Sequence, residues 1–75
     1  MESQIDMCIE EMSELIKELL KFKRGKENID HICEEIADVE ITTGQMKLIF
    51  DKDKILVNKY IQEKLVRLED RINKN

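Results

Sequence analysis

Acidic residues recur at helical spacing in two parts of the chain. Glu11, Glu14 and Glu18 are three and four residues apart, and Glu35 and Asp38 are three apart. Residues at this spacing lie on one face of a helix, one above the other. If the two helices pack antiparallel, four such carboxylates can meet within about one helical turn of height. An oxygen-rich cluster of this kind suits Mg²⁺, with Mn²⁺ as a possible substitute.

Two predicted helices carry these acids. An apolar residue recurs every three or four positions over residues 5–22, and the basic residues before Gly25 favour a helix C-terminus there. A second stripe covers residues 29–50, preceded by Asn28 as N-cap. The Thr-Thr-Gly sequence at 42–44 leaves a kink or an early end open, although a continuous helix fits the stripe better.

A third helix is predicted after Asp51 or Asp53, since either residue can cap a helix. No linker or repeat separates the three helices, so we predict one all-α domain over residues 1–75. Stripes this wide cannot all be buried within a single chain of this length. We therefore predict a helical bundle completed by oligomerisation, as a homodimer or a dimer of dimers. The apolar residues of the third stripe are Leu56, Val57, Tyr60, Ile61, Leu65, Leu68 and Ile72.

Composition and charge exclude several classes of protein. The chain has no Pro, two Gly and 40% charged residues, which is unlike a β-sheet protein. A net charge of −4 argues against binding to duplex DNA or to an anionic membrane through charge alone. The first residues lack the apolar run of a signal peptide, and no stretch is apolar enough for a membrane helix. We therefore expect a cytoplasmic protein.

Other common sites are not predicted. Cys8 and Cys33 lack C-x-x-C spacing and His31 has no partner at ligand spacing, which argues against zinc. We expect both cysteines to be reduced and buried. An EF-hand loop starting at Asp51 fails because Leu56 occupies the position that requires Gly. The Glu-x-x-His of di-iron bundles and the glycines of a phosphate-binding loop are missing as well.

The order of the two acidic motifs resembles a known family. The sequence EEMSE at 10–14 is followed by EIAD at 35–38, and E-E-x-x-E followed by E-x-x-D marks the MazG-like, all-α nucleoside triphosphate pyrophosphohydrolases. The segment KLVRL at 64–68 looks like the basic segment that follows the metal motif in that family. The resemblance implies a Mg²⁺-dependent, oligomeric enzyme that hydrolyses a nucleoside triphosphate to the monophosphate and pyrophosphate, as in house-cleaning of the nucleotide pool.

The resemblance also implies roles for individual residues. Glu11, Glu14, Glu35 and Asp38 are the implied metal ligands. A carboxylate that is not fully engaged with metal can take the proton of the attacking water, and Glu14 is our candidate for this base. Glu10 points about 100° away from Glu11 on a helix, so we expect it outside the ligand set.

Basic side chains should bind the substrate phosphates. Lys64 and Arg67 match the family segment, and Lys21 and Arg24 belong to the basic group at the end of the first helix. Any one of them can instead belong to a solvated face, paired with acids one turn away. The side chains that could stack on a base are Phe22, Phe50, Tyr60 and His31.

A different class of protein is compatible with the same residues. Charge runs on helices often serve only solubility. The alternative is therefore a non-catalytic helical dimerisation or interaction module whose acidic faces are merely solvated. The two hypotheses differ in whether the acidic cluster responds to a divalent cation.

Overall fold

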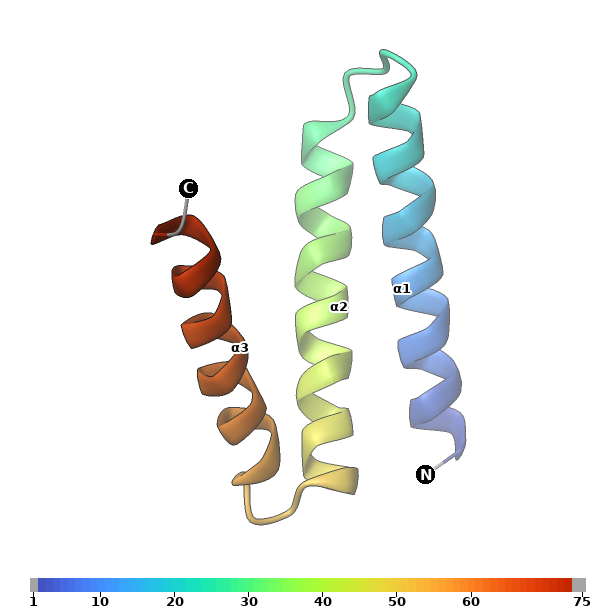
Figure 1. The fold of residues 1–75 in the computed structure, drawn as a ribbon. Coiled ribbons are helices and arrows are strands. Elements are labelled where there is room, and N and C mark those ends of the chain that lie inside the picture. The colour runs from blue at the N-terminus through green and yellow to red at the C-terminus, as the bar shows by residue number, and fades with distance from the viewer. Residues whose placement is uncertain (1, 74–75) are drawn as a thin grey trace.

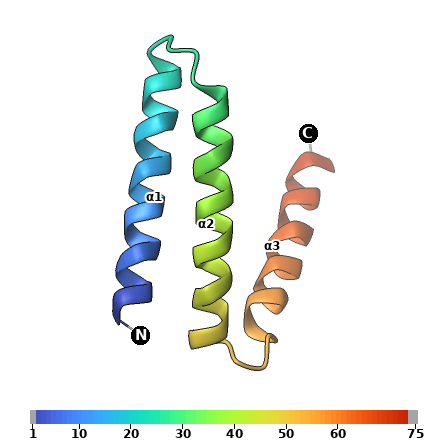
Figure 2. The ribbon, with the colours of Figure 1, turned by 180° about the vertical axis from the view of Figure 1, so that it is seen from behind.

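The computed structural model describes residues 2–73 and consists of three helices, α1 (Glu2–Lys23), α2 (Ile29–Phe50) and α3 (Leu56–Asn73). The first two run antiparallel, side by side, and form a hairpin, whereas α3 leaves the hairpin at the far end of α2 (Figures 1 and 2). No strand occurs within residues 2–73. The all-α prediction with three helices is confirmed.

The loop between α1 and α2 is held by a glycine and an asparagine. Gly25 has a φ of 98°, the left-handed conformation expected after a helix end. Asn28 occupies the N-cap position of α2, but its side chain makes no capping hydrogen bond. Its Nδ2 donates instead to the backbone oxygen and to Oε1 of Glu18, both at 2.9 Å. The buried Asn28 therefore ties the loop back to α1.

α2 continues without a break through its Thr-Thr-Gly sequence. The Thr42 hydroxyl donates to the backbone oxygen of Asp38 at 3.0 Å, and the Thr43 hydroxyl donates to that of Val39 at 2.7 Å. Both hydroxyls are thus satisfied inside the helix. Of the two possibilities, the continuous helix is the one observed, and it ends at Phe50.

Asp51 sets the elbow between α2 and α3. Its backbone N–H donates to the oxygen of Lys47 at 2.8 Å, which closes the last turn of α2. Its carboxylate accepts from the N–H groups that begin α3, at 3.3, 3.2 and 2.9 Å from Ile55, Leu56 and Val57 respectively. One residue therefore ends one helix and caps the next, and the cap is Asp51 rather than Asp53.

The described part of the chain buries few apolar side chains. Among the described residues, Cys8 is the one buried apolar side chain, and it is three residues before Glu11 and so shares a helix face with it. Cys33 is exposed, so the expectation that both cysteines are buried was wrong for this residue. The reason is its position on α2, two residues from Glu35 and therefore turned away from α1.

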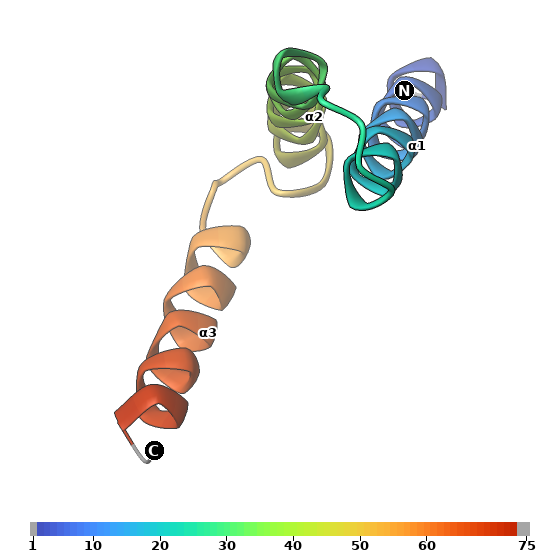
Figure 3. The same ribbon diagram turned by 90° about the horizontal axis from the view of Figure 1, so that it is seen from above.

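α3 packs along neither of the other helices. It projects out of the plane that contains α1 and α2 (Figure 3). The radius of gyration is 15.6 Å, against about 11 Å for a compact domain of this length. None of the helices described has the length and apolarity needed to cross a membrane.

Replacing Asp51 with Ala should destabilise α3 and the elbow. Hydrogen bonds from the backbone of Val57 first, and of Leu56 and Ile55, lower the pKa of Asp51. A lowered pKa means that the stability it contributes is present at neutral pH and is lost as the pH falls through that pKa. We expect Asp51→Ala to lower the melting temperature and the helix content at neutral pH, measured by circular dichroism.

The matched control is Asp53→Ala, which removes the same charge from an exposed residue of the same loop. We expect the control to melt like the wild type. Equal melting temperatures for the two variants at neutral pH would show that the cap does not stabilise the elbow.

Candidate functional site

Three carboxylates from two helices meet on one side of the hairpin. Glu11 of α1 and Glu35 and Asp38 of α2 place one oxygen each within 4.8 Å of one another. All three side chains are half-buried. The antiparallel packing of α1 and α2 positions them, because each residue sits beside the line where the two helices touch. We call these three residues the acid cluster.

Among the described residues, no basic side chain forms an ion pair with the acid cluster. Within residues 2–73 the ion pairs are Lys17 with Glu14 and Lys21 with Glu18, and neither includes a member of the cluster. Oε2 of Glu35 is buried and has no hydrogen-bond partner. Buried carboxylate oxygens normally find a donor or a cation. The acid cluster is therefore a place where a proton or a cation would be favourable.

The surroundings of the acid cluster raise the pKa values of two of its carboxyl groups. Desolvation, and next the negative charge of Asp38, raise the pKa of Glu11. Desolvation followed by the charges of Asp38 and Glu14 raises the pKa of Glu35. Each raised pKa means that holding the ionised form costs the folded state free energy.

Glu14 lies beside the acid cluster but outside it. Its Oε1 is 3.7 Å from Nζ of Lys17, and about half of its side chain is exposed. It is still near enough for its charge to contribute to the raised pKa of Glu35. Of the four predicted ligands, the structure thus brings three together and leaves the fourth next to them, where it faces water.

A second polar cluster lies one to two turns from the first. Glu18 is buried and accepts hydrogen bonds from Asn28 and from Nζ of Lys21, the latter at 3.0 Å. The bond from Asn28, followed by that from Lys21, lowers the pKa of Glu18. Lys21, a predicted phosphate ligand, is thus engaged with an acid. The spacing of seven residues from Glu11 places Glu18 on the acidic face, but nothing in the sequence indicates its bond to Asn28.

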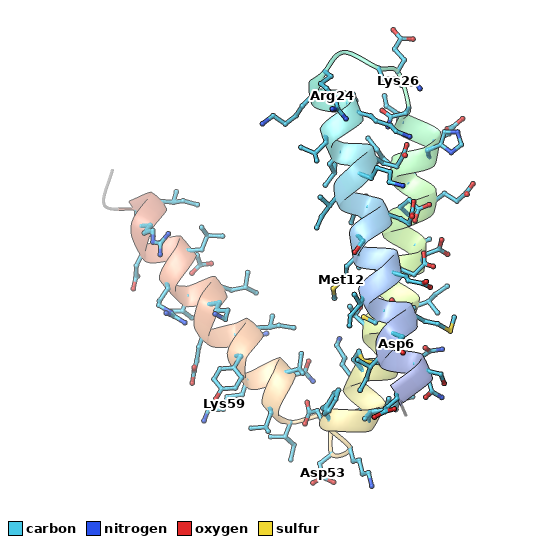
Figure 4. All side chains as sticks on the ribbon, turned by 90° about the vertical axis from the view of Figure 1, so that its right-hand side faces the viewer. Asp6, Met12, Arg24, Lys26, Asp53 and Lys59 are labelled. Atoms are coloured by element: carbon cyan, nitrogen blue, oxygen red, sulfur yellow. The ribbon has the colours of Figure 1, made fainter. Side chains whose placement is uncertain are left out.

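The other predicted phosphate ligands lie away from the acid cluster. Arg24 follows the end of α1 at the loop (Figure 4). Lys64, Arg67 and Arg71 line a shallow depression on α3, which projects from the hairpin. At the loop end, Phe22 and His31 line a hollow beside Asn28. In one chain, therefore, Lys21 is the predicted cation that shares a face with the acids.

Comparison with known proteins identifies no family for the chain. No family model, curated protein or solved structure matches the chain.

Neutralising one member of the acid cluster should stabilise the protein without metal. Because the pKa of Glu35 is raised, the folded state binds its proton more tightly than the unfolded chain does, so stability falls as the pH rises through that pKa. We expect Glu35→Gln to melt at a higher temperature than the wild type at neutral pH, with the difference shrinking at acid pH. Thermal unfolding across pH, in the presence of a chelator, measures this.

Glu40→Gln is the matched control, since Glu40 is an exposed acid of the same helix. It should melt like the wild type at every pH. A neutral-pH gain in Glu40→Gln as large as in Glu35→Gln would attribute the effect to net charge rather than to the acid cluster.

Proposed function

We propose that the protein is a Mg²⁺-dependent nucleoside triphosphate pyrophosphohydrolase, which releases the nucleoside monophosphate and pyrophosphate. The observation that carries the proposal is the acid cluster: Glu11, Glu35 and Asp38 come together, and no basic side chain within residues 2–73 pairs with them. These residues belong to the two motifs, E-E-x-x-E and E-x-x-D, on which the resemblance to the MazG-like family rests.

The donor set fits a hard divalent cation. Mg²⁺ binds carboxylate oxygens together with water and phosphate oxygens, and the acid cluster offers oxygens alone. A bound cation would give the buried, unpartnered Oε2 of Glu35 a partner and would favour the ionised forms of Glu11 and Glu35, whose pKa values are raised. Glu11, Glu35 and Asp38 would hold the ion, with Glu14 as a further ligand.

When bound, the metal would supply charge neutralisation of the phosphate oxygens and a lower pKa for the attacking water. Glu14 would accept the proton that this water loses, since its side chain is exposed beside the acid cluster. The oxygen of the water forms a bond to phosphorus as the bond between the α- and β-phosphates breaks, and pyrophosphate leaves.

Cationic side chains would hold the phosphates that the metal does not. Lys21 lies on the acidic face, and release from Glu18 would free it for a phosphate oxygen. Arg24, Lys64 and Arg67 complete the proposed set of phosphate ligands. We include in this proposal that the protein acts as a homodimer or a dimer of dimers.

The second candidate function is a non-catalytic interaction module. The observation that favours it is the large amount of exposed apolar surface on all three helices, which any helical adaptor would also have. In that case the acid cluster is a solvated face, and divalent cations should have no effect on the protein.

Pyrophosphate release tests the proposed reaction directly. The purified protein, with Mg²⁺, is incubated with a panel of ribo- and deoxyribonucleoside triphosphates, and pyrophosphate is assayed. We expect release from at least one substrate, and a loss in Glu35→Gln and Asp38→Asn above the roughly 10–100-fold that removal of an outer-sphere partner costs. Glu40→Gln should retain the wild-type rate. Absence of pyrophosphate release across the whole panel would contradict the proposed pyrophosphohydrolase activity.

Metal binding is tested separately from catalysis. A cation that binds only the folded state raises the melting temperature by mass action. We expect added Mg²⁺ or Mn²⁺ to stabilise the wild type and Glu40→Gln, and to leave Glu35→Gln unchanged. Identical melting temperatures with and without metal would support the interaction module instead.

A further inference from the structure

Glu18 is a buried acid to which the proposed reaction assigns no role. Only 9% of the residue is exposed. Its Oε1 accepts a hydrogen bond from the buried Asn28 at 2.9 Å, and its Oε2 accepts one from Nζ of Lys21 at 3.0 Å. A buried charge needs such partners, because a carboxylate without them is costly to keep ionised. Asn28 and Lys21 therefore stabilise the ionised form of Glu18 inside the hairpin.

The pair of Glu18 and Lys21 is more shielded than the other ion pair within residues 2–73. Both pairs join residues three apart on α1. Glu14 and Lys17 are 3.7 Å apart, with side chains 49% and 59% exposed. Glu18 and Lys21 are 3.0 Å apart, with side chains 11% and 36% exposed. Since water screens exposed pairs most, Lys21 is the lysine that its acid holds in one place.

The ammonium group of Lys21 lies on the acidic side of the hairpin, beyond the acid cluster. Glu18 is seven residues from Glu11, and Lys21 is seven residues from Glu14, so each continues a row that starts at a proposed site residue. Glu35, whose pKa desolvation raises most, also responds to the charge of Glu18. Seven residues correspond to about 10 Å along a helix, so a ligand of that span can contact both the acid cluster and Lys21.

A triphosphate chain has the length and the charge for these two contacts. In the proposed reaction the metal binds beside the bond between the α- and β-phosphates, so the γ-phosphate is the group farthest from the acid cluster. A terminal phosphate carries up to about two negative charges at neutral pH. The lysine ammonium is a compact charge with three donors, which suits such a group. A diphosphate ends one phosphate closer to the cluster.

A phosphate that binds Lys21 has to compete with Glu18. The ammonium gives up a charge-assisted hydrogen bond at 3.0 Å, which is stronger than a neutral one. Asn28 stays bonded to Glu18 after this exchange, so the carboxylate keeps one partner. A doubly charged terminal phosphate can replace Glu18 at the ammonium group, whereas a ligand that does not reach Lys21 leaves the pair closed.

We propose that Glu18 is a positioning residue for Lys21, which it holds in the free protein and releases to the terminal phosphate of a nucleoside triphosphate. Nucleoside diphosphates and monophosphates leave the pair closed and bind more weakly. Glu18 acts through Lys21 and does not touch the reacting atoms. This inference rests on the proposed function, and it adds which phosphate Lys21 binds and which residue controls that contact.

Binding of inorganic tripolyphosphate and of pyrophosphate, each with Mg²⁺, tests the proposal without catalysis. Calorimetry gives the dissociation constants. Glu18→Gln keeps an acceptor for Asn28 but no charge to hold Lys21, so it should bind tripolyphosphate roughly three- to tenfold more tightly than the wild type. Lys21→Met should weaken tripolyphosphate binding by a similar factor and leave pyrophosphate binding unchanged. The exposed residues Glu40 and Lys23 supply the controls Glu40→Gln and Lys23→Met, which should bind both anions like the wild type.

A double variant separates this role from simple repulsion between Glu18 and an anion. If Glu18 acts through Lys21, the tighter binding of Glu18→Gln disappears when Lys21→Met is also present. A gain caused by charge alone, or by a change in the loop, persists in that background. With a triphosphate that the protein hydrolyses, Glu18→Gln should lower KM by the same factor, with a smaller effect on kcat.

Several results would overturn the proposal. One is equal affinity of the wild type and Glu18→Gln for tripolyphosphate, including no binding by either protein. Another is a gain that persists in the double variant. If circular dichroism shows that Glu18→Gln does not fold, Lys21→Met decides, because tripolyphosphate affinity equal to that of Lys23→Met contradicts the contact.

These failures are distinct from failure of the proposed reaction. A protein that releases pyrophosphate from a triphosphate, but whose Glu18→Gln variant binds tripolyphosphate like the wild type, keeps the proposed function and loses this inference. A protein that shows the expected binding differences but releases no pyrophosphate loses the reaction and keeps the contact between Lys21 and a terminal phosphate.

Discussion

The contact between α1 and α2 is the one packed interface on which the described structure depends, and it is narrow. Two helices touch along a single line, yet apolar residues cover almost half the circumference of α1. Among residues 2–73, only Cys8 is a buried apolar side chain. The other apolar residues of α1, such as Met12, Ile16 and Leu19, therefore stay exposed on one side of this line. Glu11 and Glu14 lie on the other side.

The same contact explains why the acid cluster exists and what it costs. Antiparallel packing brings residues of α1 and α2 to a common height, and Glu11, Glu35 and Asp38 meet there. Desolvation, and next the negative charge of Asp38, raise the pKa of Glu11 and of Glu35, so the folded chain is less stable at neutral pH than it would be with neutral side chains at these two positions. A stability cost at a specific constellation, rather than on a random face, is typical of a site that binds something.

Helical periodicity predicted a large part of this arrangement. It identified the three helices and the left-handed Gly25, it narrowed the cap of α3 to Asp51 or Asp53, and it indicated that acids of α1 meet acids of α2 if the two helices pack antiparallel. It could not predict that Cys33 is exposed or that Glu14 stays outside the cluster, because a repeat gives only the angle of a side chain about its own helix and not the place of the neighbouring helix. The bond from Asn28 to Glu18 and the direction of α3 depend on loop conformation, which few residues encode.

The apolar and the acidic residues of α1 lie on different sides of the helix, so the proposed metal site is compatible with a dimer that packs through the apolar side. When two hairpins pack through their apolar faces, the acidic faces point away from the contact between hairpins, so the acid cluster is not buried against the partner's acids. An interface through the acidic side would instead bring two clusters of unpaired carboxylates together, at a high desolvation cost. A dimer contact through the apolar side of α1 would therefore leave its acidic side free for the proposed metal site.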